Sequence, residues 1–256
     1  MGTHTKDFGK ITTNVFENDS DYKKNAGYHN SFYRGKNLGT RVTAAQYAEI
    51  SAGTFADMFI GDYWVISGYN WRIAAFDYWL RSGDTECTKH HVVIVPDTNL
   101  DNQALNDSNI TTGAYVGSKM YTTYMATAKS KITSAFGSAH ILSHREYLQN
   151  AVTNGRPIGG GWFDSTIELM SEQMVYGGKV FAPVSDGSSI PNIYTVACKQ
   201  LNLFRLRPDL ISNRQTFWLR DIVSEVCFAY VNGDGRADSA GASGSRGVRP
   251  VFSIAA

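Results

Sequence analysis

The residues with the clearest potential for chemistry lie near the C-terminus, where Asn232, Asp234 and Asp238 stand in a polar, glycine-containing run. Amide and carboxylate oxygens at this spacing are typical of calcium-binding loops. However, the leading acidic ligand would fall at Tyr230, and no glutamate follows where a bidentate ligand is needed. A polar turn explains the same residues. The sequence therefore predicts no metal site, with calcium at Asn232, Asp234 and Asp238 as the open alternative.

Other reactive side chains lack a recognised catalytic pattern. His140 and His144 have the i, i+4 spacing of a helical zinc pair but no HExxH glutamate, and His90 and His91 would point to opposite faces of a strand. No GxSxG motif occurs. Residues 154–162 are rich in glycine but contain no Walker lysine, so we predict a loop that closely approaches another backbone. We predict no catalytic residues and no cofactor.

The chain has three cysteines, Cys87, Cys198 and Cys227, which are far apart in the sequence and form no CxxC pattern. An odd number at such spacing indicates neither a disulfide framework nor a zinc site. We expect reduced, partly buried thiols.

The polar C-terminal run has the composition of a binding loop. Residues 232–245 contain almost nothing that could enter a core, so they should lie on the surface. Apolar strands are predicted on both sides, at residues 217–221 and 250–254, with Pro250 at the first position of the last strand. We predict that these two strands pair and hold the loop outward. The side chains predicted to contact a ligand or receptor are Tyr230, Asn232, Asp234, Arg236, Asp238, Ser243 and Arg246.

Two arginines in these strands are predicted to be structural. Arg220 and Arg249 each lie beside apolar strand residues, so we expect partly buried guanidinium groups paired with acids or backbone carbonyls. Trp71, Trp79 and Trp218 are predicted to have structural roles as well.

The remaining elements predict an α+β fold with mainly antiparallel sheets, two main helices and long surface loops. Residues 59–66 and 70–79 read as a hairpin, and residues 91–96 as a third, central strand of the same sheet. One helix is predicted over residues 117–136, ended by Gly137. Capping boxes beginning at Thr43 and Ser165 predict helices through Ile50 and about Tyr176.

The bulk composition bounds the classes of function. The chain has 256 residues, of which 43% are hydrophobic and 18% charged, which is typical of a globular protein. Its formal net charge is +1, and no Lys/Arg run occurs, so nucleic acid and anionic membranes are excluded as expected partners. No apolar stretch approaches the roughly 20 residues of a membrane helix, and no signal peptide is evident. Residues 1–37 are polar and aperiodic, which indicates an arm or adaptor that orders against a partner, with one domain over residues 38–256.

Three segments carry a resemblance to a known family: Trp218-Leu219-Arg220, Gly247-Val248-Arg249-Pro250-Val251, and residues 61–73. They resemble an uncharacterised family of proteins from Firmicutes and their phages. That family looks like a branch of the C-type-lectin-like fold shared with formylglycine-generating enzymes and the variable adhesins of phage diversity-generating systems. The resemblance covers roughly residues 38–256, and residues 33–47 are also similar to phage-encoded relatives.

The resemblance implies a domain whose first and last strands pair and which presents residues 227–246 for binding. It implies a non-enzymatic bacteriophage virion protein, made in the host cytoplasm and attached to the tail or capsid, because the cysteines of the formylglycine enzymes have no counterpart at Cys198 or Cys227. The expected partners are other virion proteins, through the arm, and a bacterial surface glycan or protein. A homo-oligomer and a target of diversity generation are also expected. The alternatives are a purely structural capsid decoration or tail accessory protein, and a calcium-dependent lectin or formylglycine-type enzyme.

Overall fold

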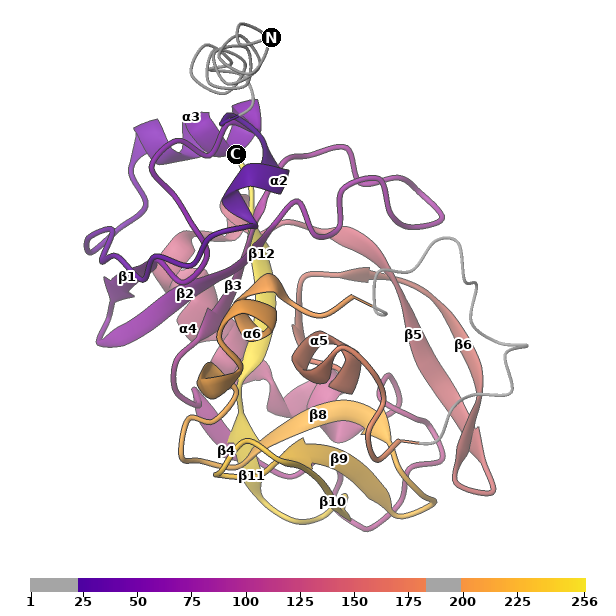
Figure 1. Ribbon diagram of the computed structural model, residues 1–256. Helices are drawn as coiled ribbons and strands as arrows, with labels where there is room; N and C mark the ends of the chain where they lie inside the picture. Colours follow the sequence, from indigo (N-terminus) through magenta and orange to yellow (C-terminus); the bar gives the residue numbers. More distant parts are fainter. Residues whose placement is uncertain (1–22, 183–198) are drawn as a thin grey trace, which may run out of the picture.

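The aromatic and β-branched runs on either side of Ser67 and Gly68 form the predicted hairpin. In the computed structural model, which describes residues 23–182 and 199–256, both turn residues have positive φ, 53° and 81°. This is the geometry of a two-residue type I′ turn, whose twist matches that of the flanking strands. The hairpin begins the first of two five-stranded sheets (Figure 1).

Sheet 1 is antiparallel throughout and has the order β1-β2-β3-β12-β7. Its strands are β1 Tyr63–Ile66, β2 Tyr69–Phe76, β3 Val92–Pro96, β7 Ile167–Leu169 and β12 Pro250–Ile254. The apolar strand β3 is buried along its whole length and lies in the middle of the sheet, as the sequence predicts. Pro250 is the first residue of β12, so the missing amide donor interrupts no ladder.

Sheet 2 has the order β10-β9-β8-β11-β4, and only the β8–β11 pair is parallel. Its strands are β4 Asp101–Gln103, β8 Phe217–Ile222, β9 Cys227–Val231, β10 Ala237–Gly241 and β11 Arg246–Val248. The predicted pairing of the two C-terminal strands is therefore wrong: β8 pairs with β9 and β11, whereas β12 belongs to sheet 1. The expected pairing of the first and last strands is also wrong, because β12 lies between β3 and β7.

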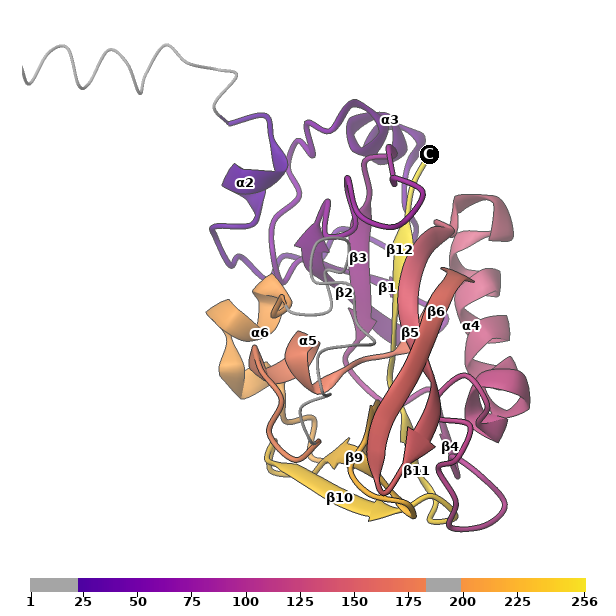
Figure 2. The ribbon, with the colours of Figure 1, turned by 90° about the vertical axis from the view of Figure 1, so that its right-hand side faces the viewer.

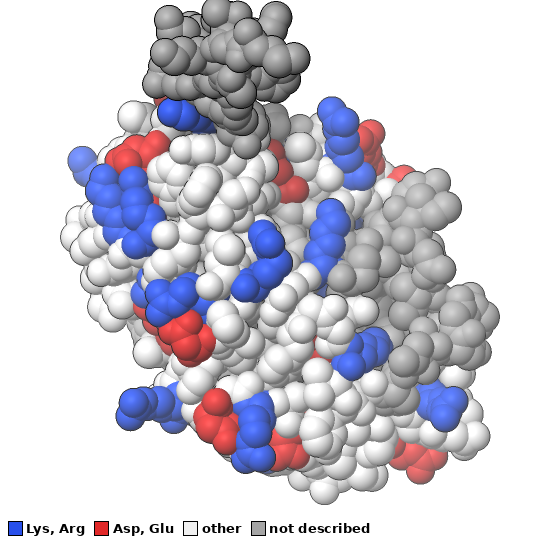
Figure 3. Space-filling model, in the orientation of Figure 1, with Lys and Arg blue, Asp and Glu red and all other residues white. Residues whose placement is uncertain are grey.

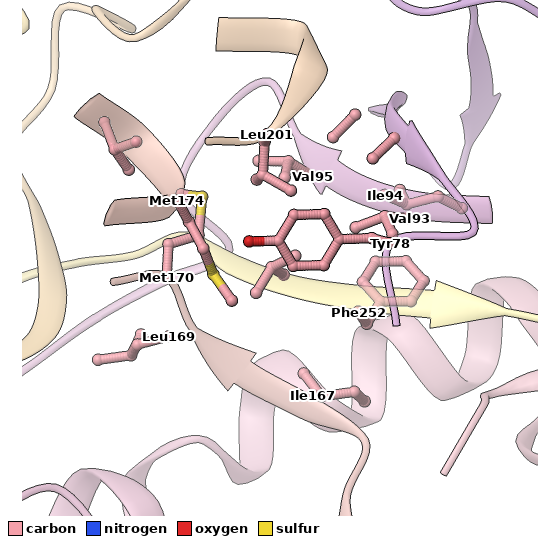
Figure 4. Packing of buried hydrophobic residues seen from close by; sticks show 14 of the residues in the cluster. Tyr78, Val93, Ile94, Val95, Ile167, Leu169, Met170, Met174, Leu201 and Phe252 are labelled. Carbon is pink, nitrogen blue, oxygen red and sulfur yellow. The ribbon is translucent and has the colours of Figure 1, made fainter. Parts of the chain in front are cut away.

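The chain passes from sheet 2 to sheet 1 at a single residue, Arg249, which separates β11 from β12. Trp218 and Val251 consequently lie in different sheets, yet both are buried in one continuous hydrophobic cluster. Figure 4 shows part of this cluster, where Tyr78 lies among side chains of β3, β7, β12 and the helix that follows β7. The two sheets thus share one core.

A long hairpin of β5 His144–Thr153 and β6 Arg156–Ser165 stands beside the two sheets (Figure 1). The prediction of a loop over residues 154–162 is wrong, since most of this segment is strand. Its expected close backbone approach is present: a Cβ on Gly155 would lie 3.1 Å from the Cα of Ser224. Asn154 and Gly155 both have positive φ and form the tight turn that connects β5 to the glycine-rich strand β6.

The helices lie on both sides of sheet 1 (Figure 2). The capping box at Thr43 and Gln46 is confirmed, and its helix ends at Gly53 in the left-handed conformation. The predicted helix over residues 117–136 is present as a π-helix followed by α4, whose Phe136 packs edge-on against Trp71 and Phe252. The helical elements are α2 Ala26–His29, α3 Ala44–Ala52, η1 Met120–Tyr124, α4 Ala126–Phe136, η2 Ser138–His140, α5 Glu172–Tyr176, α6 Asn202–Leu206 and η3 Pro208–Leu210.

The capping box predicted at Ser165 is wrong. The Ser165 hydroxyl donates to the Glu168 carboxylate at 2.9 Å inside the core, and the segment continues as strand β7. The helix starts later, where the Ser171 hydroxyl accepts from the Met174 amide, and it ends at Gly177 as predicted.

The described part of the predicted arm, residues 23–37, contacts sheet 1. His29 is buried, and the Asn30 side chain bonds both the amide and the carbonyl of Phe76. The Arg34 guanidinium forms an ion pair with the fully buried Asp62. Residues 1–22 of the arm lie outside the described residues, and so does Cys198. Over the described residues, no helix combines the length and the apolar character needed to cross a bilayer.

Candidate functional site

Three side chains form a row across one face of sheet 2. Trp218 of β8 is directly opposite Tyr230 of β9, which is opposite Asp238 of β10. The Tyr230 hydroxyl donates to Asp238 Oδ2 at 2.8 Å, and the Trp218 indole donates to the Gln103 carbonyl at 2.9 Å. Both rings are therefore fixed by polar contacts as well as by the sheet.

Arg246 of β11 extends over this row. Its guanidinium carbon lies 4.7 Å from the centroid of the Trp218 ring and 4.1 Å from that of Tyr230, which are cation–π distances. Within the described part of the chain, no carboxylate lies within 4.0 Å of this guanidinium. Its buried Nε atom has no hydrogen-bond partner. We call Trp218, Tyr230, Asp238 and Arg246 the Arg246 platform.

The platform changes the acidity of its phenol. Burial raises the pKa of Tyr230, the hydrogen bond to Asp238 raises it further, and Arg246 acts in the opposite direction. The hydroxyl therefore stays protonated and keeps its bond to Asp238 at neutral pH.

The predicted contact residues Asn232, Asp234 and Arg236 lie apart from the platform, in the turn between β9 and β10. The Asn232 amide donates to the Arg236 carbonyl at 2.7 Å, and Arg236 Nε contacts Asp234 Oδ2 at 2.7 Å. The Asn232 side chain accepts from the next amide, while Asp238 bonds Tyr230. The oxygens considered for calcium thus have separate partners and do not converge.

Ser243 lies beyond the opposite end of β10. Its amide and hydroxyl both donate to Asn109 Oδ1, at 2.9 and 2.7 Å. Residues 232–245 lie at the surface as expected, apart from the buried Ala242, but the prediction of a loop is wrong for residues 237–241, which form β10. Of the seven predicted contact residues, the structure brings together Tyr230, Asp238 and Arg246. Figure 3 shows Lys and Arg interspersed with Asp and Glu over the visible face, without a broad area of one sign.

The residues predicted to be structural are buried. Trp71 and Trp218 are fully buried, and Trp79 stacks on the His144 ring at a centroid distance of 4.0 Å. Arg249 donates to three backbone carbonyls, those of Pro96, Leu210 and Ile211. Arg220 forms an ion pair with a buried glutamate.

That glutamate belongs to a buried polar cluster that the sequence analysis missed. Arg220 Nη2 of β8 lies 2.5 Å from Glu146 Oε1 of β5, and Glu146 Oε2 lies 3.5 Å from His144 Nε2. Glu168 of β7 accepts from the Tyr115 hydroxyl at 2.9 Å. The cluster therefore connects the β5–β6 hairpin to both sheets. A signal existed: His144, Glu146 and Leu148 alternate along one inward face of β5.

The two glutamates of the cluster have opposite pKa shifts. Burial alone would raise the pKa of Glu146, but the charge of Arg220 and the contact with His144 lower it to about 2. Burial, and then the negative charge of Glu146, raise the pKa of Glu168. Glu146 is thus a stronger acid than an ordinary glutamate, and Glu168 a weaker one.

A small cleft borders the cluster. It has a volume of about 300 Å³ and is lined by Thr85, Glu86, Cys87, Ser143, His144, Arg145 and Asp164. Burial raises the pKa of the Cys87 thiol, so it is poorly suited to act as a nucleophile. Cys87 and Cys227 are both free thiols, as expected. Within residues 23–182 and 199–256, no three His, Cys, Asp or Glu side chains are grouped as a metal site requires.

His91 makes the stability of the protein sensitive to acid. Its Nε2 accepts from the Trp79 amide at 3.0 Å, and its Nδ1 faces the Lys89 carbonyl at 2.9 Å, an arrangement that suits only the neutral ring. Burial lowers the pKa of His91 from 6.5 to about 4, with a further contribution from His144.

In the unfolded chain His91 takes up a proton below about pH 6.5, whereas in the folded chain it does so only near about pH 4. The neutral ring therefore stabilises the fold fully above about pH 6.5, and this stabilisation is lost as the pH falls from about 6.5 to about 4. Between about pH 7.5 and about pH 5, we expect His91 to account for a loss of about 2 kcal/mol in the free energy of unfolding. Urea unfolding of the wild type and His91→Gln at both pH values measures it. Equal pH dependence in the two proteins would contradict this assignment.

Comparison with protein-family models, with curated proteins and with solved structures finds no match for this chain.

Proposed function

We propose that this chain is a non-enzymatic bacteriophage virion protein that contacts a glycan or protein on the bacterial surface through the β9–β10 hairpin and the Arg246 platform. The observation that carries the proposal is the convergence of Tyr230, Asp238 and Arg246 on one face of sheet 2. These side chains need no rearrangement before binding, which lowers the entropic cost of association. A C-type-lectin-like domain remains the proposed finer description of the α+β fold.

Several parts of the proposal rest on the family resemblance. They are tail or capsid attachment through the N-terminal residues, assembly as a homo-oligomer and targeted variation of the C-terminal segment. Repeated copies in a particle would strengthen weak single contacts through avidity. A near-copy of the C-terminal coding region in neighbouring DNA, differing at adenines, would support the variation.

The test is binding of the purified protein to bacterial cells. We expect a variant with alanine at Tyr230, Arg236, Asp238 and Ser243 to lose at least about tenfold in binding, because it removes side chains across the hairpin surface. Arg41→Ala, at an exposed position just before α3, should bind like the wild type. Undiminished binding by the hairpin variant, with its melting temperature preserved, would show that this surface is not the contact site.

A further inference from the structure

We propose that the Arg246 platform binds an anionic group, a carboxylate or a phosphate carried by a surface polysaccharide. This inference rests on the proposed function and specifies the chemistry of its ligand. It follows from a cation that the fold positions at the surface without giving it a counter-ion.

The fold holds the guanidinium of Arg246 in one place. In the order β10-β9-β8-β11, the side chain of Arg246 starts on β11 and reaches across β8 to the Tyr230 ring of β9. Two aromatic faces support it, at 4.7 and 4.1 Å from the guanidinium carbon. Each ring is in turn held by a hydrogen bond of its own. The planar fork of donors is thus fixed before a ligand arrives, which favours bidentate binding of an anion.

The other arginines of the same region differ from Arg246 in their contacts. Arg236 is paired with Asp234 at 2.7 Å, and Arg220 with Glu146 at 2.5 Å. Arg249 is directed at backbone carbonyls in the interior. Among the described side chains, Arg246 has no carboxylate within 4.0 Å, and its buried Nε atom lacks a partner. Because no carboxylate neutralises it, the guanidinium keeps its charge available for an anionic ligand.

The acidic member of the platform is Asp238. Asp238 lies on β10, three strands from β11 in the order β10-β9-β8-β11. It accepts from the Tyr230 hydroxyl and the Ser239 amide. It therefore does not neutralise Arg246 directly. A cation on one side of Tyr230 and a carboxylate on the other match a ligand that combines an anionic group with hydroxyls, as acidic sugars do.

The test uses affinity electrophoresis of the full chain in gels that contain polygalacturonate, poly(glycerol phosphate) or neutral dextran. We expect the wild type to be retarded by one of the anionic polymers and not by dextran. Retardation by polygalacturonate assigns a carboxylate, and retardation by poly(glycerol phosphate) assigns a phosphate. Arg246→Gln should weaken binding about tenfold to hundredfold, the range of a charge-assisted hydrogen-bonded contact.

Two further variants separate charge from fold. Arg246→Lys keeps the charge and the apolar stem over Trp218 but loses the planar fork, so we expect a smaller loss of about threefold or more. If Arg246→Gln fails to fold, Arg246→Lys serves as the test variant in its place. Arg207→Gln removes an arginine that Asp209 already neutralises, outside the hairpin and the platform, and should bind like the wild type.

The inference is overturned if dextran retards the wild type as strongly as the anionic polymers, or if both Arg246 variants bind like the wild type. It is also overturned if neither anionic polymer retards the wild type while cell binding still depends on the hairpin, a result that leaves the proposed function standing. If the wild type does not bind bacterial cells at all, the proposed function itself is wrong.

Discussion

Replacing Arg220 with methionine is expected to lower the free energy of unfolding by about 3 to 5 kcal/mol, because it leaves a buried carboxylate without its cation. Glu146 and Arg220 are both almost fully buried, at 2% and 7% relative exposure. In the variant, only His144 would oppose the effect of burial, so the pKa of Glu146 is expected to rise. Urea unfolding at neutral pH measures the change.

The matched control for this prediction removes both charges. Arg220→Met combined with Glu146→Leu replaces the ion pair with apolar side chains of similar volume, and should recover most of the lost stability. If the double variant is no more stable than Arg220→Met, packing of the arginine stem rather than its charge explains the effect.

Replacing Arg249 with methionine is expected to destabilise the protein by about 3 kcal/mol, because three buried carbonyls lose their donor. The guanidinium also packs over Phe217, at 5.0 Å from the ring centroid. Burial lowers the pKa of Arg249 to about 10, and the group remains charged at neutral pH. Because Arg249 stands where the chain leaves sheet 2 for sheet 1, the loss should separate the two sheets rather than fray one strand.

A surface arginine provides the comparison. Arg236→Met removes an exposed side chain paired only with Asp234, so its effect on the melting temperature should be negligible. An Arg249→Met protein as stable as Arg236→Met would contradict a structural role for the three carbonyl contacts.

Local signals in the sequence predicted local structure well. Ser67 and Gly68 specify a tight hairpin through their left-handed backbone, and the apolar run of β3 specifies a central strand through burial on both faces. The capping box at Thr43 succeeded because its surroundings are exposed, so the side chains can turn back to the backbone.

The same motif failed at Ser165 because the tertiary environment uses its side chains differently. Glu168 is buried and accepts from Tyr115, a residue 53 positions away along the chain, so the carboxylate is not available to cap a helix. Strand pairing failed for a related reason. Apolar strands such as β8 and β12 are equally suited to each other and to several other neighbours, and only the whole fold decides between them.

The candidate site was predictable in part. The polar composition of residues 232–245 located the hairpin, but its poor strand-forming residues concealed β10. Tyr230 and Arg246 are 16 positions apart, and their contact depends on β11 lying beside β8, which no local pattern indicates. Alternation along β5 indicated that Glu146 points inward, but its pairing with Arg220 depends on β5 packing near β8, which no local pattern indicates.

The position of the β9–β10 hairpin in an assembled particle tests the central claim most directly. Cryo-electron microscopy at a resolution that traces β9 and β10 would locate the Arg246 platform relative to neighbouring subunits. We predict that Asp238 and Arg246, the half-buried members of the platform, face solvent on the outside of the particle. A platform buried between subunits would contradict the account and favour a purely structural role. A particle that lacks this chain would also contradict it.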